Sequence, residues 1–497
     1  MALDPRTPVL VGAGQVNNRT DEGDPEREPV DLLAHALTRA AADADAPKLL
    51  AAADSVRVVS ILSWRYRDPG ALVADRVGAS LRHTAYTNMG GNTPQALLNR
   101  TFLDVAAGRA DVVLVGGAEA WRTRMAWRTD GERPPWTRQP DDLAPTEVVG
   151  DELNMSHPAE LALGIGAPVQ VYPMFETALR AAAQREPAEH HRRIAQLWAA
   201  FSAVAADNPD AWIRQRYTAE EIGTPGPENR MIGYPYPKLM NANNAVEQAA
   251  GLIVCSVEAA ERFGVPRDRW VFPHSGADSA DATFVSNRAD LLSSPAIRTA
   301  GQAVLDLAGI DADDLVHIDL YSCFPSAVEV AATELGLAVD DPDRPLTVTG
   351  GLSFAGGPWS NYVTHAVATM VRRLRDDPGA FGLCTGNGGL LTKHSLGVYS
   401  ANPPMAGFRW VDTASEASRA TTPVEAAAEY AGPATVEAYT VMHDRDGQPE
   451  RLMTAVRTPD GQRAWGASSD PGACRQAIDE ELVGHTVTLD GEGTLDV

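Results

Sequence analysis

The sequence predicts an α/β protein made of two similar halves, with an inserted segment between them and a small β domain at the carboxyl end. Short β-branched runs alternate with longer Ala-rich amphipathic stretches, the pattern of strands layered with helices. The same strand–helix order comes twice, although the residues themselves barely repeat. Past residue 433 polar and apolar residues alternate between Asp-Gly turns, which is typical of a small OB-like barrel.

In the first half, residues 8–14 are expected to form a buried strand that ends in a glycine turn. An amphipathic helix is expected at 31–42 and a strand at 55–62. A second helix at 95–107 and a buried strand at 110–117 then complete a βαβ-like unit. Because the glycine turn lacks a third glycine and an acidic partner on the next strand, a dinucleotide site is excluded.

The segment from about 121 to 238 differs in composition, being rich in Arg, Trp, Pro and Met, and we interpret it as a loop or lid domain. It contains one long helical stretch, expected at 176–206. A second α/β half begins near residue 241 with a buried segment at 251–256. The predicted domains are therefore 1–120, 121–238, 239–404 and 405–497.

Composition limits the classes of function. The 497 residues carry a formal net charge of −24, which disfavours a nucleic-acid-binding surface and favours solubility. No run reaches the ~18 to 20 apolar residues of a membrane helix, and the first residues show no signal-type pattern. The four cysteines have no metal or disulfide spacing. We expect a cytoplasmic protein with no metal and no membrane or nucleic-acid partner.

Five segments, in order along the chain, resemble motifs of one known family. They are residues 87–96 with 108–119, then 241–244, 321–324, 350–358 and 384–389. These segments resemble the motifs of thiolases, and the resemblance as a whole covers roughly residues 6–402. More narrowly, residues 386–399 and the added β domain resemble actinobacterial thiolase-like proteins of type 1, which are usually named acetyl-CoA acetyltransferase. The resemblance implies a duplicated thiolase fold of five αβαβα layers and a transferase of lipid metabolism that acts on CoA thioesters.

The chain departs from the thiolase pattern where the chemistry is done. A thiolase holds its nucleophilic cysteine at a helix start, where the helix dipole lowers the thiol pKa. Alignment on Gln95 places Gly90 at that position. The family's catalytic histidine aligns with Gly357, and its water-holding asparagine aligns with Tyr321. A covalent acyl-enzyme at this helix is therefore not expected.

Other parts of the thiolase site have counterparts in the chain. Cys384 aligns with the cysteine that moves a proton at the acyl α-carbon, and backbone N–H groups of Gly90 and Gly386 align with an oxyanion hole. Candidate catalytic residues are thus Cys384, Tyr321 and His394. Asn92, Asn243 and Gly357 are expected to contact the substrate or CoA, with no covalently bound cofactor. The CoA diphosphate is expected to meet arginines of the inserted segment: Arg122, Arg124, Arg128, Arg180, Arg192 and Arg193.

Three functions stay open at this point. The first is a CoA-thioester-binding protein of the acyltransferase family that is not a true thiolase. The second is a retro-aldolase in which Tyr321 shuttles the proton of a β-hydroxyl, as implied by a resemblance to the thiolase-fold aldolases of steroid side-chain breakdown. The third is a non-catalytic acyl-CoA binder. The thiolase resemblance implies pairing of subunits near residues 85–88, and we expect a monomer or a homodimer.

Overall fold

The computed structural model describes residues 3–19, 27–152 and 154–497. Its first sheet has six strands, in the order β1 (Pro8–Asn17), β8 (Glu247–Ser256), β4 (Val112–Ala120), β2 (Ser55–Val58), β3 (His83–Thr87) and β5 (Glu147–Val149). β8 runs antiparallel to both β1 and β4, and all ten of its residues are buried. The sequence analysis wrongly gave this strand to the second half, because a fully buried apolar run does not indicate which sheet it joins.

The second sheet has the order β10 (Leu315–Asp319), β11 (Phe381–Gly388), β12 (Lys393–Ser400), β9 (Phe272–Ala280) and β13 (Arg409–Asp412). β13 pairs with β9, and the following helix α15 (Ala414–Arg419) packs on α11 (Pro295–Ala308). The second half therefore extends past the predicted boundary at 404. The boundary was placed too early because the short strand β13 lies in polar sequence.

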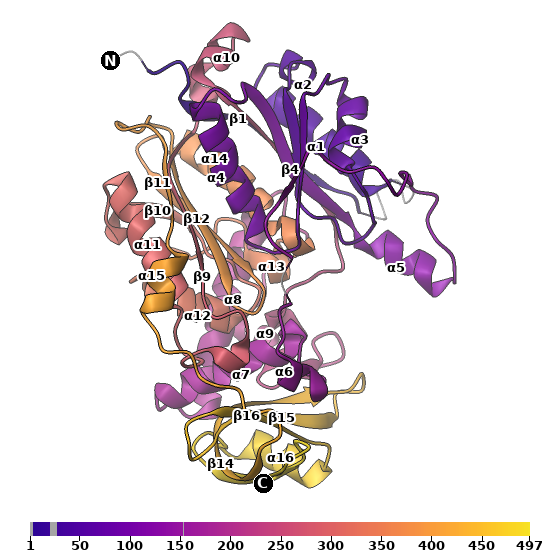
Figure 1. Cartoon of the computed structure of the whole chain (residues 1–497), viewed down its shortest axis with the longest axis vertical. Coiled ribbons are helices and arrows are strands. Elements are labelled where there is room, and N and C mark those ends of the chain that lie inside the picture. Colours follow the sequence, from indigo (N-terminus) through magenta and orange to yellow (C-terminus); the bar gives the residue numbers. More distant parts are fainter. Residues whose placement is uncertain (1–2, 20–26, 153) are drawn as a thin grey trace.

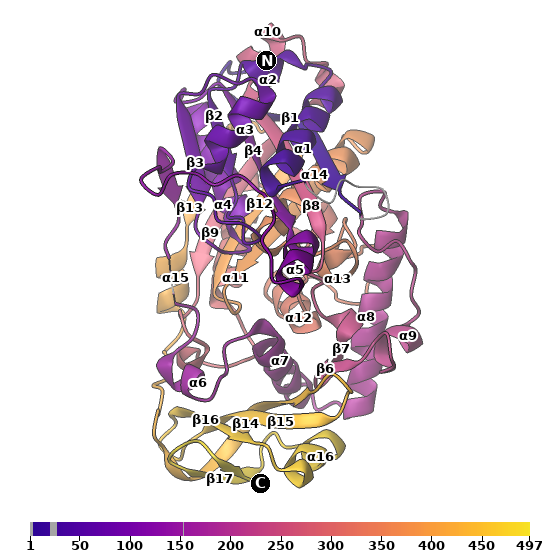
Figure 2. The same ribbon diagram turned by 90° about the vertical axis from the view of Figure 1, so that its right-hand side faces the viewer.

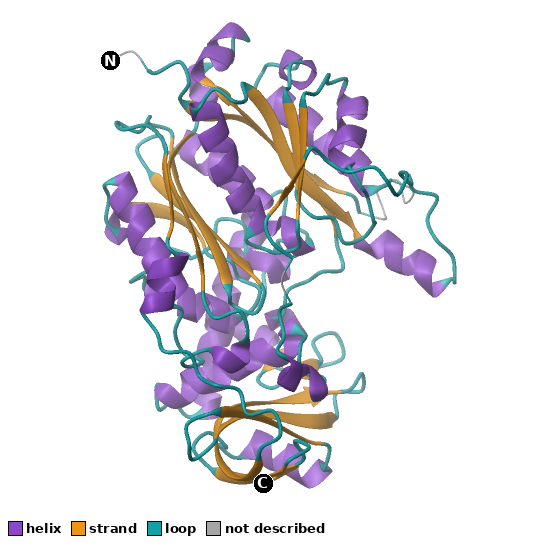
Figure 3. Ribbon diagram, in the orientation of Figure 1, coloured by secondary structure: helices purple, strands orange, loops and turns teal. Residues whose placement is uncertain are grey.

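Helices fill three layers around the two sheets (Figure 3). α4 (Thr93–Ala106) and α14 (Tyr362–Asp376) lie between the sheets and contact both. α1 (Pro29–Asp43) and α3 (Pro69–Val77) cover the outer face of the first sheet, while α11 and α12 (Pro325–Glu334) lie outside the second. The αβαβα order expected from the sequence is present. Shorter helices are α2 (Lys48–Ala51), α10 (Val257–Arg262) and α13 (Gly351–Phe354).

The glycines of β1 serve packing and do not form the predicted turn. A Cβ at Gly12 would lie 2.2 Å from the carbonyl oxygen of Ala40, and one at Gly14 would lie 2.2 Å from that of Ala36. Only residues without a side chain let β1 approach the backbone of α1 so closely. β1 therefore continues through both glycines to Asn17.

The inserted segment surrounds one end of the two sheets (Figure 1). The predicted helix at 176–206 is two helices, because Pro187 starts a new helix and Glu186 before it is extended. Its elements are α5 (Trp121–Thr129), α6 (Pro158–Ala162), α7 (Pro168–Ala182), α8 (Pro187–Asp207), α9 (Ala219–Gly223), β6 (Met231–Gly233) and β7 (Tyr236–Pro237).

The C-terminal sheet has the order β16 (Arg463–Ser468), β15 (Pro449–Arg457), β14 (Ala431–His443), β17 (Thr486–Asp490) and β18 (Leu495–Asp496), with α16 (Pro471–Asp479) after β16. A bridge between Ala467 and Thr494 brings its two edges together, as expected for a small barrel. β6 also pairs with β14, so the inserted segment joins this sheet (Figure 2).

One arginine fastens the C-terminal domain to the second half. Arg463 is fully buried and makes two 2.7 Å bonds to the carboxylate of Glu437. Its other nitrogen, Nη1, donates to the carbonyl oxygens of Val285, Ser286 and Arg288 at 2.7–3.1 Å. No helix in the described ranges is both long and apolar enough to cross a bilayer.

Candidate functional site

The predicted nucleophile position lies in the loop that leads into α4. The N–H of Gly90 donates to Ser360 Oγ at 3.2 Å, and Thr93 Oγ1 donates to the carbonyl oxygen of Gly90 at 2.7 Å. Ser360 comes from the 3-10 turn that precedes α14. The predicted oxyanion donor is therefore engaged by a hydroxyl, and a thioester oxygen could use it only after displacing that hydroxyl.

The space around this loop is filled. A Cβ at Gly90 would lie 2.7 Å from Asn92 Oδ1 and 3.4 Å from Lys393 Nζ. At Gly91, a Cβ would lie 2.3 Å from Tyr321 Oη. Asn92 Oδ1 is buried without a hydrogen-bond partner among the described residues, and the Asn92 side chain reaches Ser395 Oγ only at 3.4 Å. A nucleophilic side chain at Gly90 would require the Asn92 amide to move.

Successive residues of β11 and β12 point to opposite faces of the sheet, and this separates two of the predicted catalytic residues. Cys384 and Gly386 share the face toward α4, since a Cβ at Gly386 would lie 2.9 Å from the Cα of Asn92. His394 lies opposite Asn387 on the other face. Cys384 and His394 are therefore not brought together.

The protonation states of the predicted residues follow from their burial. Cys384 is completely buried, and burial together with the nearby Asp319 carboxylate raises its pKa well above the usual thiol value. Burial, reinforced by Cys323, also raises the pKa of Tyr321 above its usual range. Both groups are consequently protonated at neutral pH and suited to donate a proton or a hydrogen bond.

His394 and Tyr321 line a small cavity of about 10 Å³, together with Gly386 and Asn387. Burial lowers the pKa of His394 to about 4, although Asp281 opposes the shift from 3.8 Å away. The imidazole is thus neutral at pH 7. A cavity of this size holds about one water molecule and no acyl group.

Asn243 and Gly357, both predicted to contact the ligand, lie together. The N–H of Gly357 donates to the carbonyl oxygen of Asn243 at 2.9 Å, and Asn243 N–H donates to Leu352 at 3.0 Å. The next side chain after Pro358 is Trp359, which has the unusual φ of 48° and packs against Trp121 with ring centroids 4.8 Å apart. Two turns of the chain and a tryptophan pair therefore occupy this part of the site.

The predicted arginines do not converge on one point. Arg180 on α7 pairs with Glu481, and Arg193 on α8 pairs with Glu329. Arg122 lies over the ring of Trp212, 5.6 Å from its centroid. The helix α5, which carries Arg122, Arg124 and Arg128, projects away from α7 and α8 (Figure 1).

Lys393, the residue beside His394, also belongs to the candidate site, although it was not among the residues predicted from the sequence. Lys393 is partly buried and faces the α4 loop, where its Nζ donates to the carbonyl oxygen of Met89 at 3.4 Å. Desolvation lowers its pKa, with Asp151 opposing the shift. The sequence did hold a signal, because this residue is one of only three lysines among 42 basic residues: Lys48, Lys238 and Lys393.

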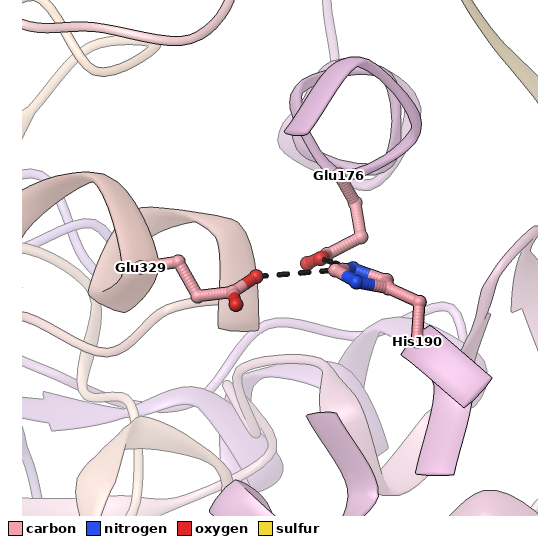
Figure 4. Close-up of side chains that lie close together, drawn as sticks. All are labelled: Glu176, His190 and Glu329. Carbon is pink, nitrogen blue, oxygen red and sulfur yellow. Dashed lines mark hydrogen bonds and ion pairs between the residues drawn. The ribbon is translucent and has the colours of Figure 1, made fainter. Parts of the chain in front are cut away.

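A second polar cluster lies between two helices of the inserted segment and α12 of the second half (Figure 4). Glu176 on α7 accepts hydrogen bonds from His190 on α8 and from the hydroxyl of Tyr236. Glu329 on α12 lies 3.9 Å from His190 and pairs with Arg193. These three side chains could reach one metal ion. Glu176 and His190 also bond each other directly, so the side chains form a buried hydrogen-bonded network.

Burial sets the pKa values in this cluster. It raises the pKa of Glu329 to about 8, and the neighbouring Glu176 carboxylate adds to the shift. It lowers the pKa of His190 to about 4. Both shifts favour the neutral forms of Glu329 and His190, and the network joins α7 and α8 to α12.

Comparison with known proteins identifies the family of the chain. The sequence family described as the thiolase-like protein type 1 additional C-terminal domain matches residues 415–494. A crystal structure of a monomeric SCP2-thiolase-like protein type 1 from Mycobacterium smegmatis is 33% identical, covers 100% of both chains and superposes with a TM-score of 0.84. The chain belongs to the thiolase-like protein type 1 family.

Two matches of lower identity are an acetyltransferase in sequence and an aldolase in fold. An acetyl-CoA acetyltransferase of Methanocaldococcus jannaschii is 23% identical over 299 residues, which cover 56% of the chain and 68% of that protein. A structure of the Ltp2–ChsH2(DUF35) aldolase is 19% identical, covers 80% of the chain and 99% of its own, and has a TM-score of 0.60. The thiolase fold and the family expected from the sequence are confirmed.

Proposed function

We propose that the protein binds a CoA thioester and holds it without becoming acylated. The observation that carries the proposal is the loop before α4, where Gly90 offers no nucleophile and Asn92 fills the adjacent space. The buried, protonated Cys384 is a poor nucleophile as well, because thiolates and not thiols attack thioesters. The acetyl-CoA acetyltransferase relative supports a CoA thioester as the ligand.

The chemistry that fits this arrangement is proton exchange at the acyl α-carbon. Displacement of the Ser360 side chain frees the Gly90 N–H to donate a hydrogen bond to a developing enolate oxygen. Cys384 lies on the same face of β11 as Gly386. Its thiol must first pass its proton to water, after which the thiolate takes the α-proton of the ligand and returns a solvent-derived proton to the same carbon. No bond to the protein forms in this sequence of steps, so a transferase reaction would have to pass the acyl group directly between two ligands.

A retro-aldol cleavage is the second candidate, and Tyr321 is the reason to consider it. Its hydroxyl lies against Gly91 at the start of α4, and the aldolase relative shares the fold. The raised pKa makes this tyrosine a proton donor, so cleavage of a β-hydroxyacyl-CoA needs another group to take the hydroxyl proton. Incubation with β-hydroxyacyl-CoA esters, followed by assay for a released aldehyde or ketone, tests this candidate.

We further propose that the protein is a cytoplasmic monomer of acyl-CoA metabolism. β5 pairs with β3 over Ala85 to Thr87, so the chain itself covers the strand edge at which a homodimer was considered. The M. smegmatis relative is described as monomeric. Light scattering on the purified protein measures the oligomeric state directly.

Titration calorimetry with CoA, acetyl-CoA and octanoyl-CoA tests the main proposal. We expect saturable binding of an acyl-CoA to the wild-type protein, and incubation in D₂O is expected to exchange the ligand's α-protons. The variant Cys384→Ala should keep the binding and lose the exchange. If no CoA ester binds, the proposal is wrong. If the wild type binds an ester without exchanging its α-protons, the protein is a non-catalytic acyl-CoA binder.

A further inference from the structure

We propose that the cavity beside the α4 loop binds an acyl chain that ends in a negatively charged oxygen, with Lys393 as its charge partner. The cavity has a volume of about 600 Å³, within the range of small-molecule sites. It lies between the loop after β2, the end of β3 and the segment before α6. Its lining includes Trp64, Arg65, Met89, Leu143, Val148 and Lys393.

The apolar wall of the cavity is unusually exposed. Met89, Leu143 and Val148 are 46%, 39% and 59% exposed, which places three of the most exposed large hydrophobic side chains around one cavity. Trp64 adds an aromatic side chain on the same lining. Because soluble proteins seldom gather such side chains without a ligand, an apolar chain is the matching occupant.

The charged lining is positive in a protein whose net charge is −24. Lys393 and Arg65 make no ion pair with any described residue, while Arg67 pairs with Asp141. Glu152 is the one carboxylate on the described lining, while Asp151 acts on Lys393 and Asp141 acts on Arg65 and Arg67 from outside it. An anionic group therefore gains a favourable field here, and an ammonium group does not.

Lys393 connects the cavity to the predicted site. Its Nζ lies 3.4 Å from the position of a Cβ on Gly90 and donates to Met89 at the cavity wall. The weak 3.4 Å bond leaves donors of the ammonium group free for a ligand oxygen. Partial burial makes such a charge-assisted bond stronger than one at an open surface.

This inference rests on the proposed function and deepens it, because it assigns the acyl part of the ligand to this cavity. The test is chosen so that failure of the inference can be told from failure of the proposed function. Octanoate is the first probe, because it has the chain and the oxyanion but no CoA. Octylamine, with the same chain and the opposite charge, is the matched ligand control. Lys393→Met is the test variant, and Lys48→Met, which changes an exposed lysine on α2, is the matched control variant.

We expect calorimetry to show octanoate binding to the wild type and to Lys48→Met, at least about tenfold weaker binding to Lys393→Met, and no comparable binding of octylamine. Leu143→Asp, which puts a like charge on the apolar wall, should weaken octanoate binding with Lys393 intact. Thermal unfolding confirms that each variant is folded, and Leu143→Asp carries the test if Lys393→Met does not fold.

Equal octanoate affinity in Lys393→Met and Lys48→Met overturns the inference, as does octylamine binding as tightly as octanoate or absence of octanoate binding to the wild type. Octanoyl-CoA distinguishes the two proposals. If octanoyl-CoA, whose acyl chain carries no oxyanion, binds while octanoate does not, the proposed function stands and the inference falls. If octanoate binds through Lys393 while no CoA ester binds, the inference stands and the proposed function falls.

Discussion

Replacing Arg463 by methionine should loosen the C-terminal domain and, through it, the candidate site. Arg463 holds the carbonyl oxygens of Val285, Ser286 and Arg288. Arg288 in turn donates to the carbonyl oxygen of Leu391 at 2.7 Å, in the loop that joins β11 to β12. One buried side chain thus links the added domain to the strands that carry Cys384 and Lys393.

The size of the effect follows from what the substitution leaves behind. Methionine replaces the aliphatic part of the side chain but leaves the buried carbonyl oxygens of Ser286 and Arg288 and part of the Glu437 carboxylate without donors, whereas Val285 still accepts from the N–H of Arg288. Breaking a buried pair of this kind costs about 3–5 kcal/mol. The entropy of unfolding for a chain of this length is about 1 kcal/mol per kelvin, so the expected decrease in Tm is about 4 °C for a single cooperative transition.

Differential scanning calorimetry measures this shift, with Arg457→Met as the matched control. Arg457 also bonds Glu437, at 2.8 Å, but its side chain is 25% exposed. Arg457 also donates to the carbonyl oxygen of Ala289 at 2.6 Å. Loss of this bond and of the partly exposed ion pair should cost about 2 kcal/mol at most, which predicts a decrease near 2 °C. Equal decreases in the two variants, or an unchanged Tm in Arg463→Met, would refute the reasoning.

Three further predictions concern the site loop, one histidine and one strand edge. Gly91→Ala should destabilise the protein to urea by about 2 kcal/mol or more, because its Cβ would lie 2.3 Å from Tyr321 Oη, whereas Gly379→Ala meets no atom within 4 Å and should be neutral. The folded-state pKa of His394 is about 4, below the unfolded value of 6.5. The free energy of unfolding of the wild type should therefore fall by about 1.4 kcal/mol per pH unit between pH 6.5 and pH 4, relative to that of His394→Gln. Parallel curves of unfolding free energy against pH for the two proteins would contradict this. Val148→Pro should break the pairing of β5 with β3 and cause self-association in light scattering, and a variant as monomeric as the wild type would show that β5 does not protect the edge.

The layered fold could be predicted from the sequence, but strand membership could not. Hydrophobic periodicity located β1, β4 and α4 to within a few residues. It could not show that β8 joins the first sheet, because the pairing partners of a wholly buried strand depend on tertiary structure. The meaning of Gly12 was missed for a similar reason, since its role depends on how close α1 lies.

The sequence motifs predicted which residues belong to the candidate site, but they did not predict how those residues are arranged in space. Alignment placed Gly90, Tyr321 and Cys384 in one site; in the structure Tyr321 Oη lies against Gly91, and Gly386, two residues after Cys384 on β11, lies against Asn92. The register of β12 decides which residue faces the loop, and it turns Lys393 inward and His394 away. A shift by one residue along a strand exchanges the two faces, so motif reading alone could not choose between these neighbours.

Mass spectrometry of one mixture of the protein with octanoyl-CoA tests the central claim most directly. Under native conditions we expect a single added mass equal to intact octanoyl-CoA, and under denaturing conditions of the same sample we expect the mass of the unmodified chain. An increment of one octanoyl group that survives denaturation would show a covalent intermediate and contradict the account. A native spectrum without any added ligand would contradict it equally.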